Sequence, residues 1–150
     1  MKLRLLTFKE LSLPELYDIM KLRQDVFIIE QNCIFPDIDG YDKKARHLIL
    51  YDGEKLAAYL RLFAPGIKYA NEVSLGRIIV EKTYRGTGTG RLLIETGIEY
   101  SVSLFGTIPI RIEAQSELRE YYNTYGFKEE GEVYIVDGIP HLQMVYQPRI

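Results

Sequence analysis

The sequence predicts an α/β protein, α+β in its arrangement, with a mixed and mostly antiparallel central sheet of six to seven strands flanked by helices. Two observations carry this prediction. Strand-like and helix-like apolar patterns alternate in the order β α β β β α β α β β. Two Asp-Gly pairs, Asp52-Gly53 and Asp137-Gly138, separate neighbouring strand patterns in the manner of hairpin turns. With 150 residues, of which 47% are hydrophobic, the chain suits a single domain spanning residues 1–150 with a packed core.

The first half of the chain is expected to contain one helix and four strands. Ser12-Leu13-Pro14-Glu15 has the pattern of a capping box with proline in the first turn, and it opens the helix. The inner face of that helix is expected to include Leu16, Ile19, Met20, Arg23, Val26 and Phe27. The strands expected here are Lys2–Phe8, His47–Tyr51, Lys55–Phe63 and Val73–Val80. The segment Glu30–Asp42 is rich in turn residues, which favours an ordered loop with a short helical turn.

The second half is expected to hold two helices and three strands. The longer helix runs from Gly88 to about Leu104, with Ile94, Ile98, Val102 and Phe105 as its apolar stripe. Ser116 is a candidate N-cap for a helix over Glu117–Tyr125, which Gly126 would end. The expected strands are Ile108–Gln115, Phe127–Val136 and Ile139–Tyr146.

Composition excludes several classes of protein. A formal net charge of −2 provides no basic field for a nucleic acid. No apolar run approaches the roughly 20 residues that a membrane span needs, and the N-terminus lacks the pattern of a secretory signal. One cysteine and two dispersed histidines give neither an internal disulfide nor a metal site. We therefore expect a cytoplasmic protein without a metal. The sequence leaves the oligomeric state open, and a homodimer is one of the alternatives.

The stretch Arg85–Gly90 carries the strongest functional signal. It joins a buried strand pattern to a helix pattern, and glycine-rich backbone amides at a helix start bind anions, most often phosphate. The lysine of a P-loop is missing, and the position past mid-chain disagrees with a dinucleotide-binding fingerprint. A flexible glycine turn without a ligand is the alternative. The stretch also matches the pattern Arg/Gln-x-x-Gly-x-Gly/Ala, with Arg85, Gly88 and Gly90 at the defined positions.

A second motif, Tyr122-Asn123-Thr124-Tyr125-Gly126-Phe127, matches Tyr-x-x-x-Gly-Phe. With the element order and the glycine loop, it resembles the GCN5-related N-acetyltransferase (GNAT) family over nearly the whole chain. The ElaA-like branch is the most similar, in Arg23–Phe27, Glu30–Cys33, Asp37–Asp42, Gly76–Val80, Ala114-Gln115 and Asp137–His141. The resemblance implies a sheet splayed between its fourth and fifth strands. It also implies transfer of an acetyl group from acetyl-CoA to a primary amine of a small molecule or peptide, by direct attack in a ternary complex.

The resemblance also assigns residues to the co-substrate. The pyrophosphate would be bound by the backbone of Arg85, Gly86, Thr87, Gly88, Thr89 and Gly90, with Arg91 as a further local cation. The pantetheine arm would pair with the backbone of Ile78, Ile79 and Val80, whose side chains are expected in the core. An N–H of that segment is a candidate oxyanion donor. Gln115 stands where the family often has an asparagine that contacts coenzyme A; glutamine keeps the amide but lengthens its reach.

The reaction further needs an acid and a base. Tyr122 occupies the family position of the general acid that protonates the leaving thiolate. Its alternative role is aromatic packing, and Tyr121 and Tyr125 are expected to be structural. His141, Glu113 and a water relay are the open candidates for the base. Cys33 is expected to be a buried, inert thiol. Asp37, Asp39 and Asp42 read as a solvated turn, although they could attract a cationic amine.

Two other functions remain open at this point. A non-catalytic acyl-CoA-binding or sensor domain would need Arg85–Gly90 but not Tyr122. An acyltransferase similar to the acyl-homoserine lactone synthases is the other alternative, although those enzymes usually lack this glycine loop. The sequence does not identify the acceptor.

Overall fold

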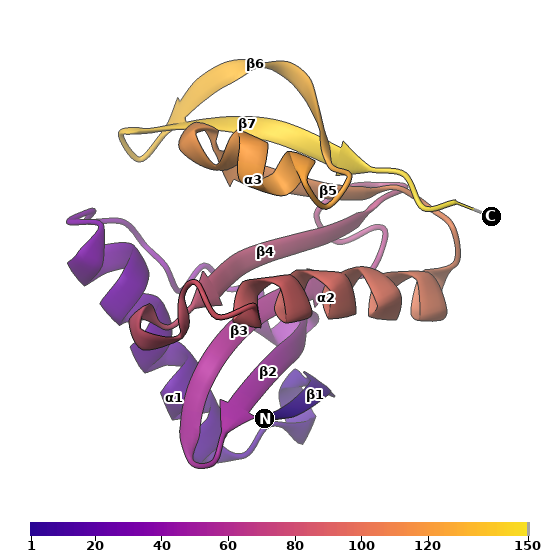
Figure 1. The fold of residues 1–150 in the computed structure, drawn as a ribbon. Helices are drawn as coiled ribbons and strands as arrows, with labels where there is room; N and C mark the ends of the chain where they lie inside the picture. The colour runs from indigo at the N-terminus through magenta and orange to yellow at the C-terminus, as the bar shows by residue number, and fades with distance from the viewer. Residues whose placement is uncertain (150) are drawn as a thin grey trace.

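The computed structural model describes residues 1–149, and its centre is a seven-stranded sheet in the order β1-β2-β3-β4-β5-β7-β6 (Figure 1). The strands are β1 Lys2–Thr7, β2 Arg46–Asp52, β3 Lys55–Phe63, β4 Val73–Val80, β5 Ile110–Gln115, β6 Lys128–Val136 and β7 Ile139–Tyr146. Every neighbouring pair is antiparallel except β4 and β5, which are parallel. The predicted mixed, mostly antiparallel sheet is confirmed.

Three α-helices accompany the sheet: α1 Leu13–Arg23, α2 Thr89–Phe105 and α3 Arg119–Asn123. The predicted capping box of α1 is present, because Ser12 Oγ accepts from the Glu15 N–H at 3.2 Å and Glu15 Oε1 accepts from the Ser12 N–H at 2.8 Å. After α1 the chain continues as a wider π-helical segment, Gln24–Glu30, which the sequence did not predict as a separate element. No helix within residues 1–149 is both long and apolar enough to cross a bilayer.

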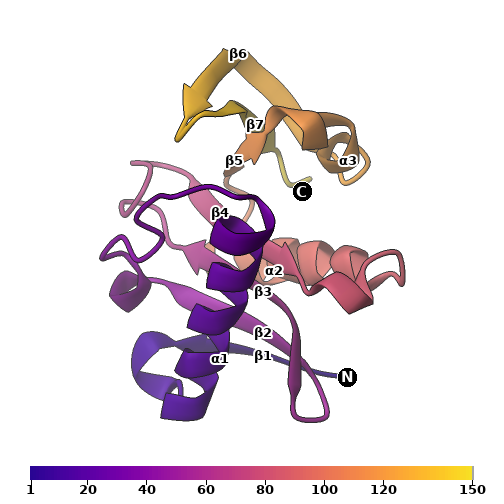
Figure 2. The ribbon, with the colours of Figure 1, turned by 90° about the vertical axis from the view of Figure 1, so that its left-hand side faces the viewer.

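Helices α1 and α2 cover opposite faces of the β1–β4 part of the sheet (Figure 2). Successive strand residues point to opposite faces, so Leu48 and Leu60 pack in the cluster beneath α2, whereas Ile49 and Tyr59 pack beneath α1. Because both faces are covered, β2 and β3 are buried almost throughout. This differs from the alternation of apolar and polar residues expected for both strands, because a strand covered on two faces buries consecutive residues such as Leu48, Ile49 and Leu50.

The predicted splay is also confirmed. β4 and β5 pair only at Val73–Ile110 and Ser74–Arg111, and beyond these residues the strands diverge (Figure 1). Figure 1 shows β5, β6, β7 and α3 as an upper layer that separates from the β1–β4 layer along this line. The divergence leaves backbone groups of β4 without a strand neighbour on that side.

Some predicted details are wrong. Ser116 is not the N-cap of a helix: it begins a 3₁₀ turn, Ser116–Leu118, and α3 begins only at Arg119 without a side-chain cap. Asp52 pairs with Lys55, so the first hairpin loop is Gly53-Glu54, one residue later than expected. The second hairpin does turn at Asp137-Gly138, where φ is 49° and 78°.

The stripe of α2 was predicted only in part. Ile94, Ile98 and Phe105 contact the core, but the most buried line includes Leu93, Gly97 and Ser101. A Cβ on Gly97 would lie 3.0 Å from Leu60 Cδ2, so the glycine allows α2 to approach β3 closely. Glycine and serine give no apolar signal, which is why the sequence pattern missed this line.

Candidate active site

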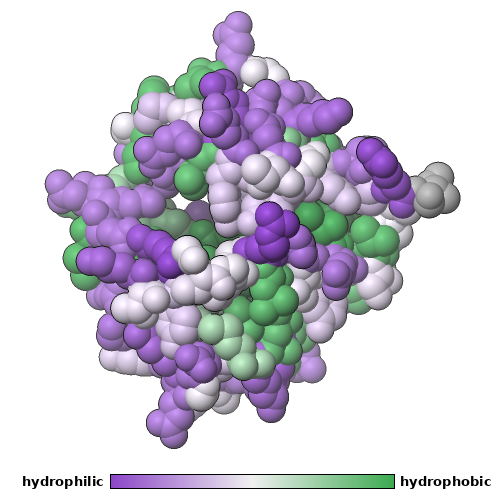
Figure 3. Space-filling model, in the orientation of Figure 1, coloured by the Kyte–Doolittle hydropathy of each residue, from purple (hydrophilic) through white to green (hydrophobic). Residues whose placement is uncertain are grey.

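A cavity of about 710 Å³ lies where β4 and β5 diverge. In Figure 3 the surface is hollowed at this place, left of centre, with apolar residues inside and polar residues around the opening. The cavity brings together most of the site residues expected from the sequence: Ile78, Ile79, Val80, Arg85, Gly86, Gly88, Gly90, Arg91, Glu113, Gln115, Tyr122 and His141. Thr87 and Thr89 do not line it.

At one end of the cavity is the turn that leads into α2. Gly86 and Gly88 are left-handed, with φ of 76° and 86°, and Gly88 is the N-cap of the helix. The bond from Leu92 N to Gly88 O, 3.1 Å, closes the first turn, so the amides of Thr89, Gly90 and Arg91 precede the helical ladder. These amides have the orientation that an anion at a helix start requires.

The two threonines and Gly90 shape this turn. Thr87 Oγ1 donates to the Tyr84 carbonyl at 2.5 Å and lies 2.8 Å from Thr89 Oγ1, which holds the turn from within. A Cβ on Gly90 would lie 2.6 Å from the Tyr121 hydroxyl and 3.4 Å from Val80 Cγ2. A side chain at position 90 would therefore displace the Tyr121 hydroxyl, because α2, α3 and β4 meet there.

The two arginines of this region are held by carboxylates. Arg85 donates to Glu30 in a bidentate pair, at 2.7 and 3.1 Å, and to the Val80 carbonyl at 3.0 Å. Arg91 donates to Glu95 at 3.0 Å and lies over the Tyr125 ring. Arg85 thus ties the glycine turn to the end of the π-helical segment, an arrangement that the sequence did not predict.

Tyr122 reaches the cavity from α3 and is only 6% exposed. Its ring packs edge-on against Tyr121 and Phe127, with centroids 5.3 and 6.1 Å away. Burial, with a smaller contribution from Tyr125, raises the pKa of the Tyr122 phenol well above its usual value, so the hydroxyl keeps its proton at neutral pH. Tyr121 and Tyr125, expected to be structural, also line the cavity.

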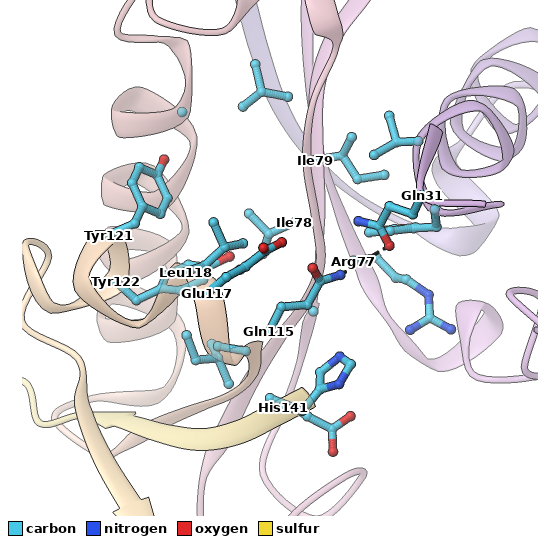
Figure 4. A pocket seen from close by; sticks show the side chains of 18 of the residues that line it. Gln31, Arg77, Ile78, Ile79, Gln115, Glu117, Leu118, Tyr121, Tyr122 and His141 are labelled. Carbon is cyan, nitrogen blue, oxygen red and sulfur yellow. Dashed lines mark hydrogen bonds between the residues drawn. The ribbon is translucent and has the colours of Figure 1, made fainter. Parts of the chain in front are cut away.

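Gln115, Glu113 and His141 come from the strands of the upper layer. Figure 4 shows Tyr121 and Tyr122 at one end of the cavity, with Gln31, Arg77 and His141 toward the other and Gln115 between them. The Gln115 amide donates to Gln31 Oε1 at 3.2 Å, which bridges β5 and the residue that follows the π-helical segment. His141 Nδ1 lies 2.7 Å from the Ile139 carbonyl, and the exposed Glu113 accepts from the Tyr134 hydroxyl at 2.6 Å.

Two expectations about residues at or near the His141 end of the cavity were wrong. Cys33 is not buried: it is partly exposed, lines the cavity, and donates to the Asp137 carbonyl at 3.4 Å across the opening. Asp37, Asp39 and Asp42 are not a solvated turn either. They pair with Arg23, Arg61 and Arg77 from α1, β3 and β4, and these six residues form what we call the ionic cluster.

The ionic cluster is mostly buried and balanced in charge. Arg23 is fully buried and donates to Asp37 at 2.9 Å and to Asp42 at 2.6 Å. Burial alone would raise the pKa of Asp39, but hydrogen bonds from Arg61 and the Tyr41 N–H outweigh it and hold that pKa well below its ordinary range. The sequence missed the cluster because its arginines are distant along the chain, so only the fold shows that they face the three aspartates.

The fold and the site define an acyltransferase: the family model for the acetyltransferase (GNAT) domain matches residues 26–148, and the chain belongs to the GNAT family. Enzymes of this class take their acyl group from a coenzyme A thioester. Among curated relatives, protein ElaA of Escherichia coli K12 is 36% identical over 137 residues, which cover 90% of this chain and 89% of ElaA. The predicted resemblance to the ElaA-like branch is thereby confirmed.

Two solved structures are similar over almost the entire chain. The crystal structure of E. coli ElaA superposes with a TM-score of 0.91 at 34% identity, covering 98% of this chain and 100% of that one. An acyl-CoA N-acyltransferase from Pseudomonas aeruginosa superposes with a TM-score of 0.91 at 35% identity, covering 97% and 98%. The predicted fold and enzyme class are confirmed.

Proposed function

We propose that this enzyme transfers an acetyl group from acetyl-CoA to a primary amine of a small molecule or peptide, by direct attack in a ternary complex. One observation carries the proposal. A single cavity has an amide-rich helix start and a buried phenol toward one end and polar groups open to an acceptor toward the other (Figure 4). Because coenzyme A thioesters are intracellular metabolites, the proposal places the enzyme in the cytoplasm.

The residues at the helix start suit the diphosphate of coenzyme A. Gly86 and Gly88 take left-handed conformations that other residues avoid, and the amides of Thr89, Gly90 and Arg91 are free of helical partners. Along the divergent part of β4, the backbone groups of Ile78–Val80 that point away from β3 suit the pantetheine arm, apart from the Val80 carbonyl, which accepts from Arg85. An N–H of the same segment would stabilise the oxyanion that forms on the thioester carbonyl.

Tyr122 fits the role of the general acid. In the reaction the amine nitrogen forms a bond to the acyl carbon, and the bond from that carbon to sulfur breaks. The departing thiolate needs a proton, because a thiol has a pKa near 8.5. A phenol whose pKa is raised by burial is protonated at neutral pH, so Tyr122 can supply that proton.

His141 is the candidate base that the geometry favours. The Ile139 carbonyl can only accept, so the 2.7 Å contact assigns the proton of a neutral imidazole to Nδ1. Nε2 then carries the lone pair that can take a proton from the acceptor ammonium. Glu113 is exposed and already accepts from Tyr134, which makes it the weaker candidate. A water relay is the third.

Direct attack is preferred over an acyl-enzyme intermediate. Cys33 is the only thiol of the chain, and its Sγ contacts the Asp137 carbonyl, which does not activate a thiol. A nucleophilic cysteine needs a neighbouring base or cation to form the thiolate. An amine that attacks the thioester directly needs no thiolate; it needs only to lose its own proton, for which His141 is the candidate base.

The test measures thiol release from acetyl-CoA with a panel of diamines, amino acids, aminoglycosides and peptide amines. We expect turnover with at least one primary amine and an acetylated product of the corresponding mass. Longer acyl-CoA thioesters, tested with the same acceptor, report whether acetyl is the preferred group. Tight binding of coenzyme A without turnover on any amine would instead favour the sensor domain.

A further inference from the structure

Strand β4 contains a bulge at the edge of the cavity. Tyr59 pairs with Ile79 and Arg61 pairs with Gly76, so two residues of β4, Arg77 and Ile78, stand opposite the single Leu60 of β3. Arg77 is left-handed, with φ of 48°. A bulge whose first residue is left-handed normally carries glycine there, since a large side chain disfavours that conformation. Something beyond the strand must therefore hold Arg77.

The side chain of Arg77 supplies that hold. Its Nε donates to Asp37 Oδ1 at 2.8 Å, and its Nη2 donates to the Asp37 carbonyl at 3.1 Å and to Asp39 Oδ2 at 3.4 Å. The guanidinium also lies over the rings of Phe27 and Phe35. Figure 4 shows the side chain directed away from the Tyr122 end of the cavity.

The other side of this contact is itself rigid. Asp37 also accepts from the buried Arg23 at 2.9 Å, and Asp39 is paired with Arg61 at 2.5 Å. Arg23 belongs to α1 and Arg61 to β3, so two elements of regular structure fix the loop that holds Arg77. The ionic cluster therefore acts on β4 through one side chain.

We propose that Arg77 is a positioning residue, which uses Asp37 and Asp39 to impose the bulge that orients the backbone of Ile78–Val80 toward the thioester. This inference rests on the proposed function. A bulge redirects the strand and its backbone groups locally. Residues 77 to 80 all line the cavity, just beyond the last pair that joins β4 to β5. The conformation at residue 77 thus decides where the neighbouring amides point.

Two substitutions at one position separate this role from a general structural one. Arg77→Leu removes the hydrogen bonds to Asp37 and Asp39 but keeps a side chain that disfavours the left-handed conformation. Arg77→Gly removes the same hydrogen bonds, but glycine adopts the left-handed conformation readily. We expect kcat to fall about a hundredfold, as when one oxyanion donor is lost, in Arg77→Leu and about threefold in Arg77→Gly. KM for acetyl-CoA should change less than threefold in both.

The matched control is Arg111→Leu. Arg111 is an arginine of the adjacent strand β5 that pairs with Glu72 and Glu130 away from the cavity, and its loss should leave kcat within about twofold. If Arg77→Leu does not fold, Arg77→Met, a straight-chain replacement, takes its place. Equal losses of kcat in the Leu and Gly variants, or no loss in either, overturn the proposal.

A second measurement does not depend on turnover. The amide resonances of Ile78 and Ile79 should move in Arg77→Leu and stay near those of the wild type in Arg77→Gly. If the Leu variant leaves these resonances in place, the bulge does not depend on Arg77 and the inference fails, whatever the acceptor is. If the resonances move as expected but no amine is acetylated, the bulge assignment stands and the proposed function fails instead.

Discussion

The two walls of the cavity are stabilised in different ways. On the β4 side, the ionic cluster ties α1, β3, β4 and the loop between α1 and β2 together by directional bonds, such as Arg23–Asp42 at 2.6 Å and Arg77–Asp37 at 2.8 Å. On the opposite side, α3 and β7 are joined by aromatic packing. The Phe127 ring lies 6.1 Å from Tyr122 and 5.6 Å from Tyr146.

The difference matches what each wall has to provide. Charged hydrogen bonds have strict geometry and therefore fix the direction of a backbone segment. Aromatic packing is less directional, but it removes water from a phenol and so keeps it protonated. One wall thus presents backbone amides in a defined orientation, and the other presents a desolvated proton donor.

The largest expected effect concerns the stability of the β4 wall. Asp37→Asn removes a charge that the buried Arg23 and the half-buried Arg77 share, and we expect the free energy of unfolding to fall by about 3 kcal/mol. Urea denaturation measures the change. Asp25→Asn, in the exposed Lys21–Asp25 pair, is the matched control and should have no measurable effect. If Asp37→Asn and Asp25→Asn lowered the free energy of unfolding by similar amounts, the ionic cluster would not stabilise the β4 wall more than an exposed ion pair does.

The aromatic wall should be sensitive in catalysis rather than in stability. Tyr122→Phe keeps the packing against Phe127 but loses the proton donor, so kcat should fall about a hundredfold. KM for acetyl-CoA should change less than threefold, and the free energy of unfolding by no more than about 1 kcal/mol. Tyr100→Phe, on α2 and outside the cavity, is the control. A kcat near the wild-type value in Tyr122→Phe would exclude the phenol as the acid.

The turn between the walls can be tested through coenzyme A binding. Gly88→Val places a β-branched residue at φ of 86° in open space, so the turn must shift its amides while the core is untouched. We expect calorimetry to show about tenfold weaker binding. Gly66→Val has the same conformational problem in a distant loop, at φ of 93°, and should bind normally. Unchanged affinity in Gly88→Val would contradict the phosphate-binding role.

The smallest expected effect is a pH dependence of the β4 wall. His47 is fully buried beside the ionic cluster, with its ring nitrogens 2.6 Å from the Tyr59 hydroxyl and 2.8 Å from the Asp42 carbonyl. Burial lowers the pKa of His47 below its ordinary 6.5, so the unfolded chain binds the proton more readily than the folded protein. The stability that neutral His47 allows is fully present above pH 6.5 and decreases as the pH falls below it.

Thermal denaturation between pH 7.5 and pH 5 would detect this decrease. The window lies above the ordinary carboxylate value of 4.5, so the acidic side chains contribute little to it. His47→Gln cannot titrate, and its stability should be flatter across the window. An equal slope in the wild type and in His47→Gln would rule out this histidine as the source.

Much of the fold was readable from local signals. The capping box at Ser12, the Asp137-Gly138 turn and the strand patterns of β3 and β4 depend on neighbouring residues, so their elements were predicted with nearly the right bounds. Where the signal was not local the prediction failed. The start of α3 and the Gly97 line of α2 depend on packing against other elements.

The candidate site shows the same division between features with a local sequence signal and features that depend on distant segments. The sequence by itself determined the glycine turn, the tyrosine motif and the family, because each lies within a short stretch whose chemistry is legible from residue types and spacing. Only the tertiary structure decided that Asp37, Asp39 and Asp42 pair with three arginines, and that Arg77 is left-handed within a strand. The physical reason is that ion pairing and backbone strain depend on which distant segments meet, and the folded chain alone sets those distances.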